Sequence, residues 1–145
     1  MPGAARRHRR VAEHDARGSL RVGIDCVLIA EVADSLARFG DRYVRHTFTE
    51  DEAAYCLAAP EHASAARFAA RFAAKEAAVK VLDPDRPWAD WRAIEVRRRP
   101  SGSCTLVLHG AAAALARRRG ISRLALSMTH DAERAAAIVL ASAER

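Results

Sequence analysis

An alanine-rich stretch, residues 67–82, constrains the fold more than any other feature, because neither glycine nor proline interrupts it. Alanine is the strongest helix former, so the stretch predicts a long helix. Phe68, Phe72 and Val79 recur at helical spacing and share one face of that helix. We therefore expect the chain to be organised around one long helix that buries this face.

The same stretch holds the only two lysines, although lysine and arginine together number 24 in the chain. Lys75 and Glu76 flank the apolar stripe on opposite sides, so we expect both at the border between core and surface. Lys80 follows Glu76 by one helical turn, and Arg71 precedes Lys75 by one turn. Lysine is a compact, mobile charge that suits phosphate binding. A plain surface ion pair between Glu76 and Lys80 is the alternative explanation.

The length of 145 residues and the hydrophobic content of 50% fit a single globular domain, which we place at residues 20–145. The formal net charge is +6, but residues 1–21 contribute six arginines against two acidic residues, which is +4 and leaves +2 for the rest. A body with so little excess charge and only 6% aromatic residues does not predict a nucleic-acid-binding surface.

Residues 1–19 have an arginine cluster and no apolar periodicity, which predicts a flexible basic arm. Contact with nucleic acid or membrane and a dispensable extension are both compatible with such an arm. The sequence shows no membrane-spanning run and no secretory signal. Cys26, Cys56 and Cys104 lie far apart without metal-binding spacing, so we expect free, mostly buried thiols and a cytoplasmic location.

The remaining segments predict an α+β fold in which an antiparallel sheet packs on the long helix. Thr49 and Glu52 form a capping box that opens a helix ending near residue 58. Glu61 or Ser64 is expected to begin the long helix. The other expected elements are strands at 20–27, 91–97, 104–108, 123–130 and 135–141 and helices at 29–39 and 110–119, although the alanines at 135–141 also permit a helix.

Polar groups at three separate places suit one common site: Asp25 at the expected end of the first strand, the charges of the long helix, and His130 at the end of a later strand. Two carboxylates from different elements can hold Mg²⁺, which keeps several waters and takes phosphate oxygens as further ligands. Adjacent cations would neutralise phosphate charge, an arrangement that suits phosphoryl-type transfer. Arg45, in a predicted loop, is a candidate contact for an anionic cofactor. The alternatives are an N-cap role for Asp25 and a structural role for His130.

Four motifs occur in a characteristic order: Gly-Ile-Asp at 23–25, Phe-Thr-Glu-Asp-Glu at 48–52, Arg-Phe-Ala-Ala-Lys-Glu-Ala-Ala-Val-Lys at 71–80, and Ser-Met-Thr-His at 127–130. Together they resemble the motifs of holo-[acyl-carrier-protein] synthases, the small 4′-phosphopantetheinyl transferases. The third motif is highly specific, the first is specific at its distance upstream, and the last is weaker on its own. The resemblance extends over about residues 21–142.

The resemblance implies the 4′-phosphopantetheinyl transferase fold and Mg²⁺-dependent transfer of the phosphopantetheine arm of CoA to a serine of an apo-acyl carrier protein. Adenosine 3′,5′-bisphosphate would be the second product. The resemblance also implies a homotrimer with active sites at the subunit interfaces. Residue by residue, it implies metal ligands at Asp25 and Glu76 and CoA contacts at Arg71, Lys75, Lys80 and His130.

The serine of the carrier is a weak nucleophile and needs a base. Glu76, directly or through a metal-bound water, is the first candidate, and Asp25 through a water is the second. A non-catalytic module of the same fold that binds CoA or a carrier protein is the alternative function.

Two positions depart from the family pattern. Glu31 stands where the family usually has an arginine that meets the acidic carrier, and Gly102-Ser103-Cys104 replaces the usual Gly-Lys-Pro. The first departure predicts a preference for a dedicated carrier domain, as in a polyketide or similar pathway. The second predicts looser contacts to CoA.

Overall fold

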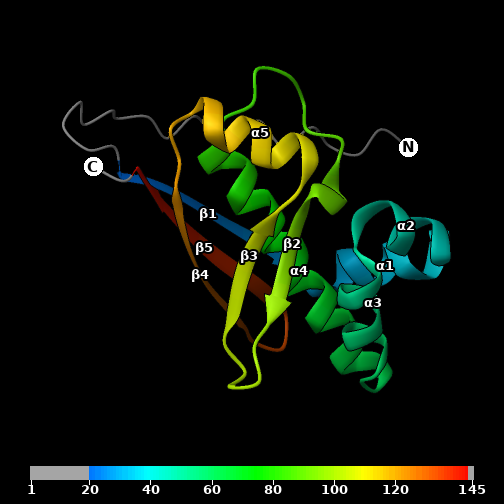
Figure 1. Ribbon diagram of the computed structural model, residues 1–145. Coiled ribbons are helices and arrows are strands. Elements are labelled where there is room, and N and C mark those ends of the chain that lie inside the picture. The colour runs from blue at the N-terminus through cyan, green and yellow to red at the C-terminus, as the bar shows by residue number, and fades with distance from the viewer. Residues whose placement is uncertain (1–19, 144–145) are drawn as a thin grey trace.

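The computed structural model describes residues 20–143, so the predicted basic arm at 1–19 lies outside the described residues. The part of the chain that the structure describes has the predicted α+β architecture, and Figure 1 shows its arrangement. Its elements are β1 (Leu20–Leu28), α1 (Ile29–Phe39), α2 (Asp41–Thr47), α3 (Glu50–Leu57), α4 (Glu61–Leu82), the short 3₁₀ helix η1 (Trp91–Ala93), β2 (Ile94–Arg98), β3 (Cys104–Leu108), α5 (Gly110–Arg118), β4 (Arg123–His130) and β5 (Arg134–Ser142).

The long helix α4 lies between two antiparallel sheets (Figure 1). One sheet has three strands in the order β1-β5-β4, and the other is the hairpin of β2 and β3. In the larger sheet Asp25 lies opposite Ala137, which in turn lies opposite Met128. These three residues belong to the face that packs on α4, where the inward residues of β1 and β5 are buried. The segment at 135–141 is therefore a strand, as predicted, and not a helix.

Small residues let α4 approach this sheet closely. Ala73 and Ala77 are fully buried in the helix, and Ala137 is buried in the facing strand. Gly23 of β1 lies so close to the helix that a Cβ atom there would be 2.1 Å from the carbonyl oxygen of Ala77. A glycine is required at this position by the contact and not by an unusual backbone angle.

The structure corrects two predicted boundaries. Residues 91–93, predicted to begin a strand, form η1 instead, and β2 begins at Ile94. The predicted loop that carries Arg45 is the helix α2, because Gly40, with a φ of 50°, ends α1 and lets a second helix begin at Asp41. The capping box of Thr49 and Glu52 is confirmed.

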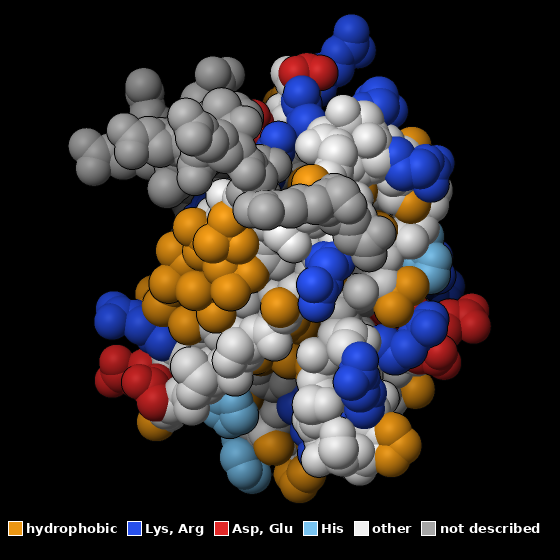
Figure 2. All heavy atoms as spheres, turned by 60° about the vertical axis from the view of Figure 1, so that its left-hand side comes forward, with side chains coloured by type: hydrophobic (Ala, Val, Ile, Leu, Met, Phe, Trp, Pro, Cys, Tyr) orange, Lys and Arg blue, Asp and Glu red, His pale blue; other side chains and the backbone are white. Residues whose placement is uncertain are grey.

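The face of the larger sheet that points away from α4 is apolar. Leu20, Val22 and Ile24 of β1 are 63%, 43% and 60% exposed, and Ile138 and Leu140 of β5 lie beside them. Figure 2 shows hydrophobic side chains gathered on this side of the molecule. A patch of this kind usually marks an interaction surface. No helix within residues 20–143 is long and apolar enough to cross a bilayer.

Candidate active site

Asp25 and Lys80 join β1 to α4 at the centre of the candidate site. The Nζ atom of Lys80 lies 3.3 Å from Oδ1 of Asp25 and donates a 2.6 Å hydrogen bond to the carbonyl of Ile24. The side chain of Asp25 is only 7% exposed, whereas that of Lys80 is 27% exposed. The strand predicted at 20–27 extends to Leu28, so Asp25 lies inside β1, and Leu28 takes the N-cap position of α1. The N-cap alternative for Asp25 is thereby excluded.

Glu76 lies one helical turn before Lys80 on α4 and is half-buried. Burial raises the pKa of Tyr43 well above its usual range, and the nearby carboxylate of Glu76 adds to this shift. Tyr43 also packs edge-on against Phe48, with ring centroids 5.8 Å apart. Glu76 therefore lies near Tyr43 of α2 and one helical turn from Lys80, the residue that contacts Asp25.

The donor set fits a magnesium ion. Asp25 and Glu76 offer carboxylate oxygens, the hard ligands that Mg²⁺ prefers, from two rigid elements. Within residues 20–143 there is no group of three or more histidine, cysteine, aspartate or glutamate side chains arranged to hold a metal. Two carboxylates suffice for Mg²⁺, since this ion normally retains waters and takes phosphate oxygens from its substrate.

Lys75 lies inside the core, so the expectation that it lies at the border between core and surface is wrong. Its side chain is fully buried, and Nζ donates to Oε1 of Glu52 at 2.8 Å and to the carbonyls of Trp91 and Ile94 at 3.0 and 2.5 Å. Burial lowers the pKa of Lys75, although the carboxylate of Glu52 opposes this shift. An ammonium group has three donors, and here all three bind acceptors of the protein. None remains for a CoA phosphate, which argues against the CoA contact that the resemblance implies for Lys75.

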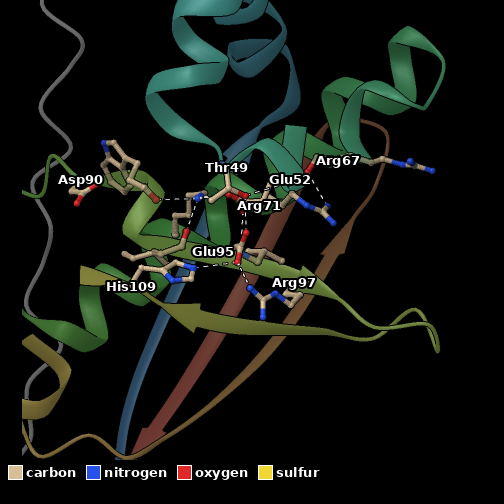
Figure 3. Close-up of polar contacts among 12 residues, drawn as sticks. Thr49, Glu52, Arg67, Arg71, Asp90, Glu95, Arg97 and His109 are labelled. Carbon is tan, nitrogen blue, oxygen red and sulfur yellow. Dashed lines mark hydrogen bonds and ion pairs between the residues drawn. The ribbon is translucent and has the colours of Figure 1, made fainter. Parts of the chain in front are cut away.

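From the Lys75–Glu52 ion pair, further polar contacts lead through Thr49 and Glu95 to His109 at the N-terminal end of α5 (Figure 3). Thr49 donates from Oγ1 to Glu95 at 2.8 Å, and Glu95 also accepts hydrogen bonds from Arg97 and His109. Burial alone would raise the pKa of Glu95, but the hydrogen bonds from these three residues outweigh it, and the pKa is lowered. The carboxylate of Glu95 is therefore held in its charged form.

Arg71 belongs to a cluster of guanidinium groups around one tyrosine ring. Arg71 is 4% exposed, and its guanidinium carbon lies 4.4 Å from the ring centroid of Tyr55. The corresponding distances for Arg67 and Arg98 are 4.2 and 5.3 Å. Three cations gathered in this way create a positive field that suits an anionic ligand.

Two other predicted residues lie at the surface. His130 is exposed at the end of β4, opposite Ala135, and this register places it on the face of the sheet that carries Asp25. Arg45 is exposed on α2 and lies 3.8 Å from Asp41, one turn earlier. The structure therefore brings Asp25, Lys80 and Glu76 to one region. Among residues 20–143, His130 and Arg45 make no hydrogen bond or ion pair to these three residues.

The sequence predicted Glu52 only as part of a capping box and did not single out Tyr43 or Glu95. The carboxylate of Glu52 also accepts from Lys75 and from the backbone N–H of Val96, so it has a second role in the core. One signal pointed to this role: Lys75 is one of only two lysines in an arginine-rich chain.

The family assignment follows from comparison with known proteins. Residues 21–139 match the model of the 4′-phosphopantetheinyl transferase superfamily. The chain is 42% identical over 122 residues to the holo-[acyl-carrier-protein] synthase of Koribacter versatilis, with 83% of this chain and 96% of that protein covered. It is 40% identical over 119 residues to the synthase of Gloeobacter violaceus, with 82% and 89% covered. The chain therefore belongs to the 4′-phosphopantetheinyl transferase superfamily and, within it, to the holo-[acyl-carrier-protein] synthases.

Solved structures confirm the fold. An apo synthase from Chronobacterium ammoniagenes superposes with a TM-score of 0.77 at 30% identity, covering 89% of this chain and all of that one. The complex of the synthase from this organism with CoA gives a TM-score of 0.74 at 29% identity, covering 88% and 99% of the two chains. Both the resemblance and the single-domain α+β fold predicted from the sequence are confirmed.

Proposed function

We propose that this protein transfers the 4′-phosphopantetheine group from CoA to a serine of an apo-acyl carrier protein and releases adenosine 3′,5′-bisphosphate. The contact of Lys80 with Asp25, one turn from Glu76, carries the proposal, because it gathers two carboxylates and a cation in a chain of this family. The solved relative with bound CoA supports CoA as the donor. The free cysteines among the described residues agree with a cytoplasmic location.

In this proposal Asp25 and Glu76 hold Mg²⁺, which would neutralise charge on the pyrophosphate of CoA. Lys80 is placed to contact a phosphate oxygen, since its ammonium is partly exposed beside Asp25. Arg71, with the cluster around Tyr55, is a second phosphate contact, and His130 and Arg45 remain candidate contacts at the surface.

The reaction forms a bond from the serine oxygen to the β-phosphorus of CoA and breaks the bond from that phosphorus to the oxygen of the leaving bisphosphate. The proton of the serine hydroxyl passes to a base. Glu76, directly or through a water, is the first candidate, and Asp25 through a water is the second.

Mass spectrometry of the carrier tests the proposed function. The purified chain is mixed with CoA, Mg²⁺ and a panel of apo-carrier proteins, and each carrier is weighed. A gain of one phosphopantetheine group that EDTA abolishes is the expected result. Binding of CoA without any gain on any carrier would instead favour the non-catalytic module.

Glu31 is expected to influence the choice of carrier. It is exposed in the first turn of α1, and the family resemblance places an arginine there against the acidic carrier. Replacement by arginine (Glu31→Arg) should raise the rate on acidic fatty-acid carriers relative to other carriers severalfold, because opposite charges speed association. The same charge reversal at Glu61 on α4 is the control, and an unchanged ratio in Glu31→Arg would contradict this role.

We also propose that the chain forms a homotrimer whose active sites lie at the interfaces. The apolar outer face of the larger sheet supports this, with further copies of the chain as its occupant. Ile24 belongs to that face, while the next residue, Asp25, points to the opposite face with α4. Contact between copies on this sheet would therefore lie one sheet thickness from the metal ligands.

Substitution of Ile24 by lysine is expected to disrupt the trimer, because burying an unpaired ammonium in an apolar interface is costly. We expect the mass measured by light scattering to fall to that of a monomer and transfer to slow at least about tenfold. Leu57→Lys is the matched control, since Leu57 is a similarly exposed hydrophobic residue on α3, at 62%. A trimer that survives Ile24→Lys would show that the copies meet elsewhere.

A further inference from the structure

Glu52 and Lys75 form an ion pair that is buried in the described core, with the two residues 2% and 0% exposed. Oε1 of Glu52 accepts from the backbone of Thr49 at 2.9 Å and from Lys75 at 2.8 Å, and Oε2 accepts from the backbone of Val96 at 3.0 Å. Lys75 meanwhile binds the carbonyls of Trp91 and Ile94. One ammonium group thus ties α4 to α3, η1 and β2 through directed bonds.

Lys80 and Gly23 fix the same helix from the side of the larger sheet. Lys80 reaches the carbonyl of Ile24 and the carboxylate of Asp25, and Gly23 lets the backbone of Ala77 approach β1. Glu76 stands between these attachments, next to Lys75 in sequence and one turn before Lys80. Since successive side chains on a helix are about 100° apart, the direction of Lys75 determines where Glu76 points.

We propose that Glu52 and Lys75 form a positioning pair that sets the rotation of α4 and thereby presents Glu76 to the metal site with Asp25. This inference rests on the proposed function and assigns Lys75 a role inside the protein. Glu52 and Lys75 touch neither metal nor substrate and act through Glu76.

The chemistry of the pair favours positioning over simple stabilisation. A buried ion pair is weak evidence for stability, because apolar side chains of similar volume commonly do as well. Such apolar side chains have no directed bonds, however, and would leave the rotation of α4 less well defined. A ligand held by neighbouring groups binds metal more tightly, and loss of such support typically costs tenfold to a hundredfold in metal affinity.

The test uses the full chain and Mn²⁺, a spectroscopic probe of Mg²⁺ sites. The variants are Glu52→Gln, Lys75→Met and the double variant. Each single substitution leaves one buried charge without its partner, so both a lower Tm and weaker Mn²⁺ binding are expected. The double variant removes both charges, so most of the lost Tm should return while Mn²⁺ binding stays about tenfold weaker than in the wild type.

Leu82→Ala is the matched control, because it removes a buried apolar side chain from the same helix without touching the pair. We expect this control to lower Tm and to keep the Mn²⁺ affinity of the wild type. A double variant that binds Mn²⁺ as tightly as the wild type overturns the positioning pair and leaves the proposed function intact. A wild-type chain without Mn²⁺ binding at Asp25 and Glu76 overturns the metal assignment and the pair with it.

Two further readouts keep the proposal testable where the double variant does not fold. Glu52→Asp keeps both charges but withdraws the carboxylate from β2, and we expect at least threefold weaker Mn²⁺ binding. Wild-type affinity in this folded variant also overturns the proposal. Steady-state kinetics separate positioning from direct contact: a higher KM for CoA in Lys75→Met but not in Glu52→Gln would assign Lys75 to the cofactor instead.

Discussion

Replacement of Glu76 by glutamine is expected to slow phosphopantetheine transfer by at least a thousandfold, which corresponds to about 4 kcal/mol of transition-state stabilisation. Glutamine has nearly the shape of glutamate but lacks its charge, so it binds Mg²⁺ poorly and cannot accept the proton of the serine. Both candidate roles of Glu76 are lost together. The measurement is the rate at which apo-carrier gains mass in the presence of CoA and saturating Mg²⁺.

The loss of transfer identifies a role of Glu76 only if the Glu76→Gln variant keeps the wild-type fold. Glu76 is half-buried, so the variant should unfold within a few degrees of the wild type, and circular dichroism checks this. Glu61→Gln is the control, since it makes the same chemical change on the exposed first turn of α4. Transfer by Glu76→Gln at more than a tenth of the wild-type rate would exclude Glu76 as both base and essential metal ligand.

The long helix and the order of the strands were predictable because they depend on local signals. The alanine-rich run made α4 a helix, and turn residues separated the short apolar segments that became strands. The four motifs then identified the family, which the comparisons confirm. Asp25 and Lys80, predicted to share a site, are in contact through α4 and β1.

The burial of Lys75 was not predictable from the sequence around it. Helical periodicity placed this residue at the edge of the apolar stripe, but periodicity does not show what packs against that edge. The partners of Lys75 are Glu52, 23 residues earlier, and the carbonyl of Ile94, 19 residues later. Only the tertiary fold brings these acceptors to the helix, so a residue expected at the border between core and surface became part of the core.

The position of Asp25 within its strand shows a second limit. The strand was expected at 20–27 with Asp25 near its end, and the cost of burying a carboxylate there pointed to an N-cap role or a metal ligand. In the structure the strand continues to Leu28, and the ammonium of Lys80 provides the partner that makes burial of Asp25 tolerable. A charged residue inside a strand therefore indicated a long-range partner here and not the N-cap of the following helix.

Gly23→Ala is expected to lower the free energy of unfolding by about 3 kcal/mol or more and to abolish most transfer activity. The added Cβ would lie 2.1 Å from the carbonyl oxygen of Ala77 and 3.1 Å from Cγ2 of Val81. Neither the helix backbone nor the strand can yield without separating α4 from β1. Because Asp25 is two residues further along the same face of β1, that separation would also draw it away from Lys80. Urea denaturation and the carrier assay measure the two effects.

Gly120→Ala separates this steric cost from the general cost of replacing a glycine. Gly120 has a φ of 70°, and a Cβ added there would meet nothing within 4 Å, so its replacement strains only the backbone, by about 1 kcal/mol. We expect that variant to keep its transfer rate. If Gly23→Ala instead matched Gly120→Ala in stability and activity, the close approach of α4 to β1 would not be what sets the distance between the two carboxylates. A larger loss in Gly23→Ala would give the glycine of the Gly-Ile-Asp motif a physical reason: it brings the strand that carries Asp25 against the helix that carries Glu76, the two proposed metal ligands.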